Sequence, residues 1–110
     1  MGICNGFQAL VKSGLLPYGR LGMVTKESPT LFRNGQVAFQ YVDAENRPTT
    51  DSPYNPNGSS FGIEGIIDPS GQILGKMGHT ERYERDLMKN IHGEKVQDIF
   101  SNAVNYFLNR

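Results

Sequence analysis

The chain has no tryptophan and only one cysteine, and its eleven basic residues are balanced by eleven acidic ones. A lone cysteine cannot form an internal disulfide, and one cysteine with two histidines is a poor supply of metal ligands, so we expect no metal site. Neither sign of charge forms a block. The sequence therefore lacks the electrostatic footprint of a protein that binds nucleic acid or an anionic membrane.

Long apolar runs are also missing. The apolar stretches last only a handful of residues, and the start at Met1-Gly2-Ile3 has no basic segment, so we expect neither a membrane span nor a secretory signal. We therefore expect a cytoplasmic location. A length of 110 residues suits one small domain with one modest core, and residues 1–110 are interpreted as a single domain.

Helical periodicity occurs near both ends of the chain. Apolar residues at helical spacing predict a helix over residues 6–16, which Gly14 can end with a left-handed cap and Pro17 would not continue. Residues 18–34 show no clear period, and a short helix is expected over 83–90. The clearest helix lies near the C-terminus, where one apolar face is formed by Val96, Ile99, Phe100, Ala103, Val104 and Phe107.

Strand signals fill the middle of the chain. Alternating side chains with β-branched and aromatic members predict a strand over residues 36–42. The turn Asp68-Pro69-Ser70-Gly71 predicts an antiparallel hairpin between strands at 63–67 and 72–77. The expected fold class is α/β, with a small mixed sheet and flanking helices.

One potential nucleophile lies between two glycines at the start of the chain. Cys4 is flanked by Gly2 and Gly6 directly before the first predicted helix, which is the arrangement of a nucleophile elbow. Glycine avoids clashes where a sharp turn brings backbone close together, and the helix N-terminus can stabilise a thiolate and a developing oxyanion. The alternative is a buried structural cysteine beside a glycine turn.

A cysteine nucleophile normally needs a base, and the base needs an orienting group. His79-Thr80-Glu81 offers both, because residues two apart on an extended segment face the same side. Taken alone, a surface histidine near a glutamate is more often without function. His92 has no carboxylate two residues further on, and we interpret it as a solvated histidine at a helix end.

Four ordered motifs carry a family resemblance. They are Gly2-Ile3-Cys4-Asn5-Gly6-Phe7-Gln8, Gly14-Leu15-Leu16-Pro17, Asn55-Pro56-Asn57-Gly58-Ser59 and Gly78-His79-Thr80-Glu81-Arg82. Together the motifs resemble the class I glutamine amidotransferase domain of phosphoribosylformylglycinamidine synthase. The resemblance implies a partial form of the flavodoxin-like fold of these glutaminases.

The resemblance also implies roles for the site residues. Cys4 would attack the side-chain amide of glutamine, His79 would protonate the departing ammonia and then activate water, and Glu81 would orient His79. The backbone N–H of Asn5 would donate to the oxyanion. Gln8 would contact the bound glutamine.

The resemblance further implies partners. Ammonia would pass to a separate synthetase portion, which would use ATP and magnesium to convert formylglycinamide ribonucleotide to its amidine, while this chain would need no cofactor. The long loop over 49–60 is predicted to face the active-site mouth or the synthetase portion, with Asn55 and Asn57 offering side chains to it; the alternative is a plain connection. An isolated chain is expected to form a homo-oligomer, because lost strands would leave apolar surface and a sheet edge uncovered.

Departures from the family pattern leave other functions open. The interval from Cys4 to His79 is shorter than in the family, which indicates a truncated domain with an internal deletion near residues 33–35, and only Met1-Gly2-Ile3 precede the elbow. We therefore expect an incomplete oxyanion hole and impaired activity of the isolated chain. The alternatives are a non-catalytic assembly module that keeps the scaffold and an independent Cys-His hydrolase acting on another amide.

Overall fold

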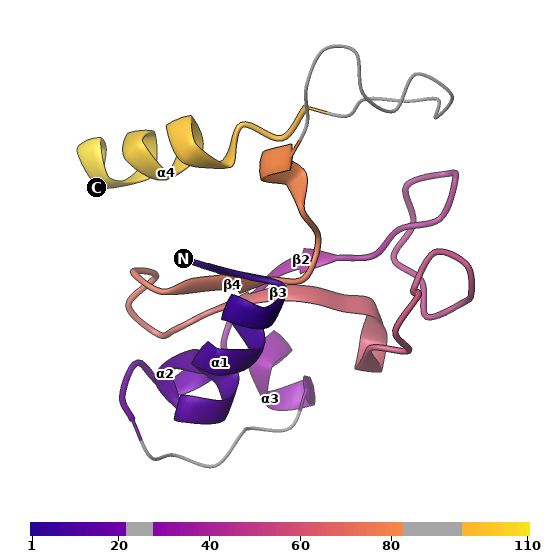
Figure 1. Cartoon of the computed structure of the whole chain (residues 1–110), viewed down its shortest axis with the longest axis horizontal. Coiled ribbons are helices and arrows are strands. Elements are labelled where there is room, and N and C mark those ends of the chain that lie inside the picture. The colour runs from indigo at the N-terminus through magenta and orange to yellow at the C-terminus, as the bar shows by residue number, and fades with distance from the viewer. Residues whose placement is uncertain (22–27, 83–95) are drawn as a thin grey trace. The chain divides into compact units, whose positions relative to one another are not determined.

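A computed structural model describes residues 1–21, 28–82 and 96–110. The chain divides into two compact units, Met1–Gly78 and His79–Arg110, and each is described by itself. Figure 1 shows the helices and strands of both units. The predicted helix over 83–90 and His92 lie outside the described residues.

The first unit is built on a four-stranded mixed sheet. Its strands are β1 (Gly2–Ile3), β2 (Val37–Gln40), β3 (Ile63–Ile67) and β4 (Leu74–Lys76), in the spatial order β1-β4-β3-β2. Strands β1 and β4 are parallel, whereas β3 pairs antiparallel with both β4 and β2. The structure confirms the α/β class, the middle strand and the hairpin. Strand β3 has the predicted bounds, whereas β2 and β4 are shorter than predicted.

Three helices cover one side of this sheet (Figure 1). They are α1 (Asn5–Ser13), α2 (Leu15–Tyr18) and α3 (Ser28–Arg33). Gly14 ends α1 in the predicted left-handed conformation, with φ 85°. The first helix does not continue to Pro17, as predicted, but it ends at Ser13 rather than at residue 16. Leu16 is extended directly before the proline, and the chain then makes one further short turn within α2. Helix α3 lies in the stretch where the sequence shows no period.

The core of the first unit lies between the helices and the sheet. Leu16, Leu31, Ile63 and Ile66 are buried together, and Phe7, Leu10, Val11, Val37 and Ile73 pack against them. The helices approach the sheet closely at Gly75. A Cβ at this position would lie 2.3 Å from Phe7 and 2.6 Å from Leu16, so glycine is required for the contact.

The hairpin turn between β3 and β4 is held by the buried carboxylate of Asp68. It accepts hydrogen bonds from the hydroxyl of Ser70 at 2.6 Å and from the backbone N–H of Ile73 at 2.8 Å. Burial opposes ionisation of Asp68, but these hydrogen bonds outweigh it and lower the pKa of the carboxyl. Gly71 completes the turn with φ 73°, as the sequence signal requires.

The second unit contains a short 3-10 helix, η2 (Thr80–Arg82), and helix α4 (Ile99–Leu108). The carboxylate of Asp98 caps α4 by accepting a hydrogen bond from the backbone N–H of Ser101 at 3.3 Å. The predicted C-terminal helix is confirmed. Among the described residues, no helix is long and apolar enough to cross a membrane.

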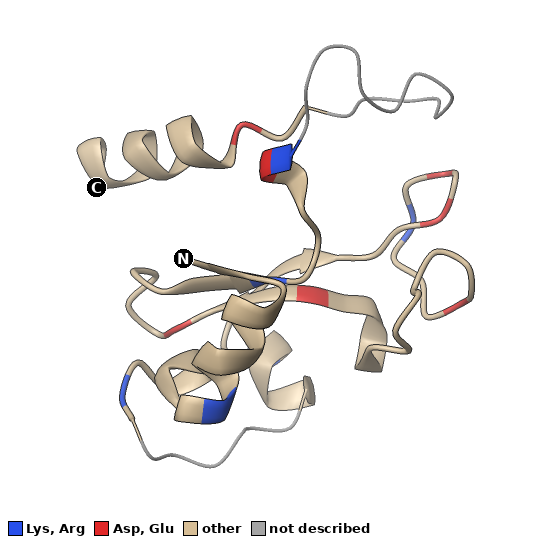
Figure 2. Cartoon of the chain, in the orientation of Figure 1, with Lys and Arg blue, Asp and Glu red and all other residues tan. Residues whose placement is uncertain are grey.

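Charged residues are scattered over the described elements and form no single-sign stripe (Figure 2). Two of them lie within the sheet itself, the acidic residue of β3 and the basic residue of β4, which are Glu64 and Lys76. Both side chains are buried. Charges inside a sheet of this size are unusual, because burial of an ionised group is costly unless it is paired.

Candidate functional site

Cys4 occupies a strained turn between β1 and α1. Its φ of 54° and ψ of −111° lie outside the ordinary regions for residues other than glycine, and such strain is concentrated at functional sites. Gly2 allows the turn, because a Cβ there would lie 2.6 Å from the side chain of Leu10 and 2.7 Å from the backbone of Gly6. The local structure is therefore the strand-turn-helix of a nucleophile elbow.

The thiol of Cys4 is free and half-buried at the N-terminus of α1. The first N–H groups of a helix have no acceptor within it, so Asn5 and Gly6 present backbone donors beside the turn. Gln8 is exposed one turn further along, and its own N–H donates to the carbonyl of Cys4 at 3.1 Å. This arrangement can stabilise negative charge that develops next to the sulfur.

The parallel pairing of β1 and β4 defines one end of the sheet as the site end. Ile3 pairs with Lys76, so the residues that follow them, Cys4 and Met77-Gly78, leave the sheet at the same end. In α/β folds, ligands bind outside the carboxyl ends of the strands. The backbone N–H of Cys4 donates to the carbonyl of Lys76 at 2.8 Å, which fixes the turn to β4.

His79 and Glu81 form a contact within the second unit. Nδ1 of His79 lies 2.6 Å from Oε1 of Glu81, and both side chains are partly exposed. This hydrogen bond, together with the nearby charge of Arg82, holds the pKa of the Glu81 carboxyl below its usual value. The predicted pairing is formed, but the segment is not extended as expected, because Thr80 and Glu81 lie in η2.

Each unit thus gathers part of the predicted set. The first unit brings Cys4, Asn5 and Gln8 to one turn and the start of one helix, and the second brings His79 to Glu81. A pocket of about 180 Å³ adjoins Glu81 and is otherwise lined by Thr80 and residues 96–100. Within residues 1–21, 28–82 and 96–110, no three His, Cys, Asp or Glu side chains are grouped so that they could hold a metal ion.

Sequence reasoning missed two charged residues behind the Cys4 turn. Lys76 is 1% exposed and Glu64 is 8% exposed, and the ammonium lies 3.7 Å from the carboxylate. Burial raises the pKa of the Tyr41 hydroxyl, and the negative charges of Glu64 and Cys4 raise it further, so these groups lie within electrostatic reach of one another. The only signal in the sequence was a pair of charges in strands that otherwise contain apolar residues and glycine.

The connection between β2 and β3 uses Asn55 differently from the prediction. Asn55 is 4% exposed, and its side-chain amide both donates to the carbonyl of Ser59 at 2.8 Å and accepts from the N–H of Ser59 at 3.0 Å. A second, longer bond reaches the carbonyl of Thr50. The side chain of Asn55 is therefore engaged within the loop and is not offered to a partner as predicted, whereas Asn57 is exposed.

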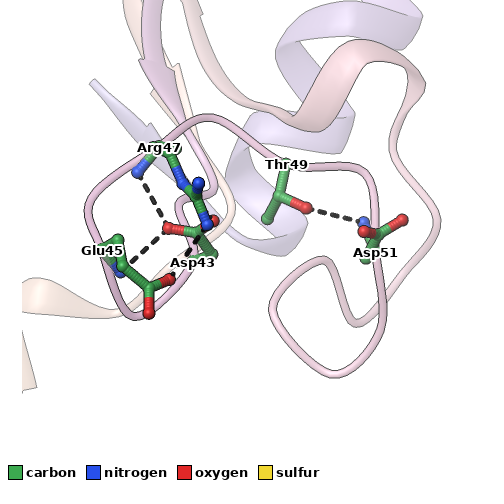
Figure 3. Close-up of polar contacts among 5 residues, drawn as sticks. All are labelled: Asp43, Glu45, Arg47, Thr49 and Asp51. Carbon is green, nitrogen blue, oxygen red and sulfur yellow. Dashed lines mark hydrogen bonds and ion pairs between the residues drawn. The ribbon is translucent and has the colours of Figure 1, made fainter.

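The same connection contains a charged turn, shown in Figure 3. The carboxylate of Asp43 accepts from the backbone N–H groups of Glu45 and Arg47 at 2.9 and 3.0 Å and also binds the guanidinium of Arg47 at 3.0 Å. These backbone hydrogen bonds are the main reason that the pKa of the Asp43 carboxyl is lowered. The turn is exposed, and its bonds are local.

A comparison with models of known protein families finds a match. Residues 19–107 match the CobB/CobQ-like glutamine amidotransferase domain. His79 and Glu81 lie inside the matched range, and Cys4, Asn5 and Gln8 precede it.

Curated relatives are similar over most of this chain. "Phosphoribosylformylglycinamidine synthase subunit PurQ" of Methanococcus maripaludis is 38% identical over 81% of the chain and 39% of the relative. The proteins of the same name from Thermomicrobium roseum and Chlorobaculum parvum are 32% and 30% identical, over 77% and 87% of the chain and 54% and 55% of the relatives.

The chain spans about half the length of the curated relatives it matches, or less. Two of the alignments run over 130 and 140 positions, which is more than the 110 residues of the chain, so those relatives carry internal residues that have no counterpart here. The expected internal shortening is thus confirmed. From the range that the domain family matches and from these relatives, the chain belongs to the CobB/CobQ-like glutamine amidotransferase domain family.

Proposed function

We propose that this chain provides the glutaminase chemistry of phosphoribosylformylglycinamidine synthase, releasing ammonia from glutamine. One observation carries the proposal: Cys4 lies in a strained turn that leads from the carboxyl end of β1 into α1. The thiol of Cys4 is free and half-buried there. This is the position at which a class I glutaminase needs its nucleophile. The names of the relatives support the choice of enzyme.

The proposed reaction begins at the sulfur. His79 takes the proton of the Cys4 thiol, and the resulting thiolate attacks the side-chain carbonyl carbon of glutamine. The oxyanion that forms is stabilised by the backbone N–H of Asn5 at the start of α1. Collapse of this intermediate breaks the carbon–nitrogen bond and leaves a thioester. Ammonia departs with a proton supplied by His79. Gln8, exposed one turn into α1, contacts the bound glutamine.

The second half of the reaction restores the enzyme. His79 takes a proton from water, which attacks the thioester and releases glutamate and the free thiol. Glu81 holds the imidazole through the 2.6 Å hydrogen bond to Nδ1, and this leaves Nε2 for proton transfer. The tautomer is thereby set by a carboxylate that stays ionised, in keeping with its lowered pKa.

We further propose that the partner is the synthetase portion of the same enzyme, which uses ATP and magnesium. The relatives are named as subunits of the synthase, which supports a separate partner chain. Of the two asparagines, Asn57 is the one exposed in the loop between β2 and β3 and able to meet the partner, since Asn55 is used internally.

The test is amidination of formylglycinamide ribonucleotide by the chain together with the synthetase portion, ATP and magnesium. Glutamine should support product formation, and Cys4→Ser should abolish that activity while ammonia-driven synthesis persists. Glutamine hydrolysis without any gain in product would instead indicate an independent hydrolase. A folded chain that supports neither glutamine hydrolysis nor glutamine-driven product formation would be a non-catalytic module.

A further inference from the structure

The buried pair of Glu64 and Lys76 has no role in the reaction derived above. Two ionised groups in a small sheet are costly unless they are paired and hydrogen-bonded. Their charged atoms lie 3.7 Å apart, and the ammonium also lies 4.9 Å from the ring centroid of Phe39. Apolar residues of similar size would fill the same space at lower cost. We therefore expect that the buried Glu64–Lys76 pair maintains a specific contact.

Glu64 makes such a contact at the end of β4. Its backbone carbonyl accepts from the N–H of Met77 at 3.0 Å, and its carboxylate accepts from the N–H of Gly78 at 2.6 Å. One residue thus binds two successive donors at the point where the strand ends. A carboxylate bonded to a backbone N–H forms one of the stronger hydrogen bonds in proteins. The path of the chain is therefore fixed as far as Gly78, the residue directly before His79.

The lack of a side chain at Gly78 leaves room for that carboxylate. A Cβ at this position would lie 2.7 Å from Oε1 of Glu64, closer than real contacts allow. Any other residue would have to displace the carboxylate. The glycine before His79 and the glutamate in β3 therefore depend on each other.

Lys76 connects the same pair to the nucleophile. Its side chain faces Glu64, and its backbone carbonyl accepts from the N–H of Cys4 at 2.8 Å. Both hydrogen bonds, one to Cys4 and one to Gly78, lie at the carboxyl end of β1 and β4.

We propose that Glu64, with Lys76 as its counter-ion, is a positioning residue of the glutaminase site, which holds the strand ends that lead to Cys4 and to His79. The inference rests on the proposed function, since it assumes that Cys4 is the nucleophile. Glu64 touches no reacting atom. Its effect passes through the backbone of Gly78 and through the side chain of Lys76.

The experiment measures covalent labelling of Cys4 by a diazoketone analogue of glutamine, separating the maximal rate from the concentration for half-maximal rate. The key variant is the double substitution Glu64→Leu with Lys76→Met, which removes both charges together and leaves neither unpaired. We expect a folded protein whose maximal labelling rate falls about tenfold, because small misplacements of reacting groups are costly. The half-maximal concentration should change less than about twofold, because uniform substrate binding is unaffected.

Two further variants separate positioning from a plain structural role. Glu64→Gln combined with Lys76→Met keeps an acceptor for the N–H of Gly78, leaves no charge unpaired and should retain most of the maximal rate. The matched control is Glu45→Leu with Arg47→Met, which removes an exposed ion pair whose atoms lie 3.2 Å apart. This control should label at the rate of the unaltered chain.

A folded double variant Glu64→Leu with Lys76→Met that labels at the full rate would overturn the inference. If that variant does not fold, Gly78→Ala decides the question, because its Cβ displaces the carboxylate while both charges remain, and full-rate labelling would again overturn the inference. In the unaltered chain, amide hydrogen exchange at Gly78 should be strongly protected, and unprotected exchange would refute the contact. Absence of labelling in the unaltered chain, with Gly78 protected, would instead refute the proposed function.

Discussion

The backbone N–H of Cys4 donates a hydrogen bond to the carbonyl of Lys76 at 2.8 Å, joining the turn before α1 to the end of β4. This bond belongs to the parallel ladder of β1 and β4, in which Ile3 pairs with Lys76. The position of the sulfur is therefore set by the sheet as well as by the helix that follows. A nucleophile held from both sides loses little freedom when substrate binds.

The close approach at Gly2 can be tested with a matched pair of glycine substitutions. Gly2→Ala would place a methyl group 2.6 Å from Leu10 and 2.7 Å from the backbone of Gly6, and should lower the free energy of unfolding by about 1–3 kcal/mol. Gly6→Ala meets no atom within 4 Å and lies in α1, so it should be neutral or raise stability by about 0.5–1 kcal/mol. Urea unfolding checks both. Equal effects would mean that the turn is not tightly packed.

Asp68 makes the stability of the hairpin depend on pH. Its pKa is lower in the folded chain than in the unfolded chain, so its contribution is complete above the unfolded value and is lost as pH falls through the folded value. Asp68→Asn should therefore flatten the loss of stability at acid pH, as followed by thermal unfolding at several pH values. Asp51→Asn, which removes one carboxylate at an exposed position, provides the matched control. If Asp68→Asn loses stability at acid pH as steeply as the unaltered chain, Asp68 is not the source of this pH dependence.

The hydrogen bond between His79 and Glu81 should matter for the rate. Replacing Glu81 with Ala removes the acceptor of Nδ1 and should slow labelling of Cys4 by the glutamine analogue by at least about tenfold, because the base loses its orientation. Arg82→Gln is the control. Its guanidinium lies 3.8 Å from Glu81 and is largely exposed, so its loss should change the rate less than about threefold. Labelling of the Glu81 variant at the full rate would show that Glu81 does not orient the catalytic base.

The loop between β2 and β3 contains one asparagine that is hydrogen-bonded within the loop and one that is exposed. Asn55→Ala leaves the half-buried N–H and carbonyl of Ser59 without their partner and should cost about 1–3 kcal/mol of stability. Asn57→Ala should change stability by less than about 0.5 kcal/mol. If this loop meets the synthetase portion, Asn57→Ala should instead weaken glutamine-driven amidination while ammonia-driven synthesis is retained. Full coupling in Asn57→Ala would make the loop a plain connection.

Local patterns were sufficient to predict the elements with strong signals. The cap at Gly14, the hairpin turn at Asp68 and the C-terminal helix each depend on residues close in sequence, and all three are present. The elbow at Cys4 was predictable for the same reason. Helix α3 was missed, because six residues are too few to show a period.

The missed contacts of Glu64 and Lys76 join residues far apart in the chain. The carboxylate of Glu64 meets Gly78, and the ammonium of Lys76 meets that same carboxylate, across a strand pair. A charge in a strand normally indicates a solvated face, and only the packed sheet shows that these two charges lie inside. The bond between Asn55 and Ser59 is local and was missed for another reason, because loops have similar composition whether their turn-forming side chains point outward or inward.

The most direct test of the account is the intact mass of the chain after treatment with a diazoketone analogue of glutamine. We predict one adduct per chain, located at Cys4 by peptide mapping, prevented by excess glutamine and absent in Cys4→Ser. A folded chain that remains unlabelled, or one that is labelled at another residue with Cys4 untouched, would contradict the assignment of Cys4 as the nucleophile.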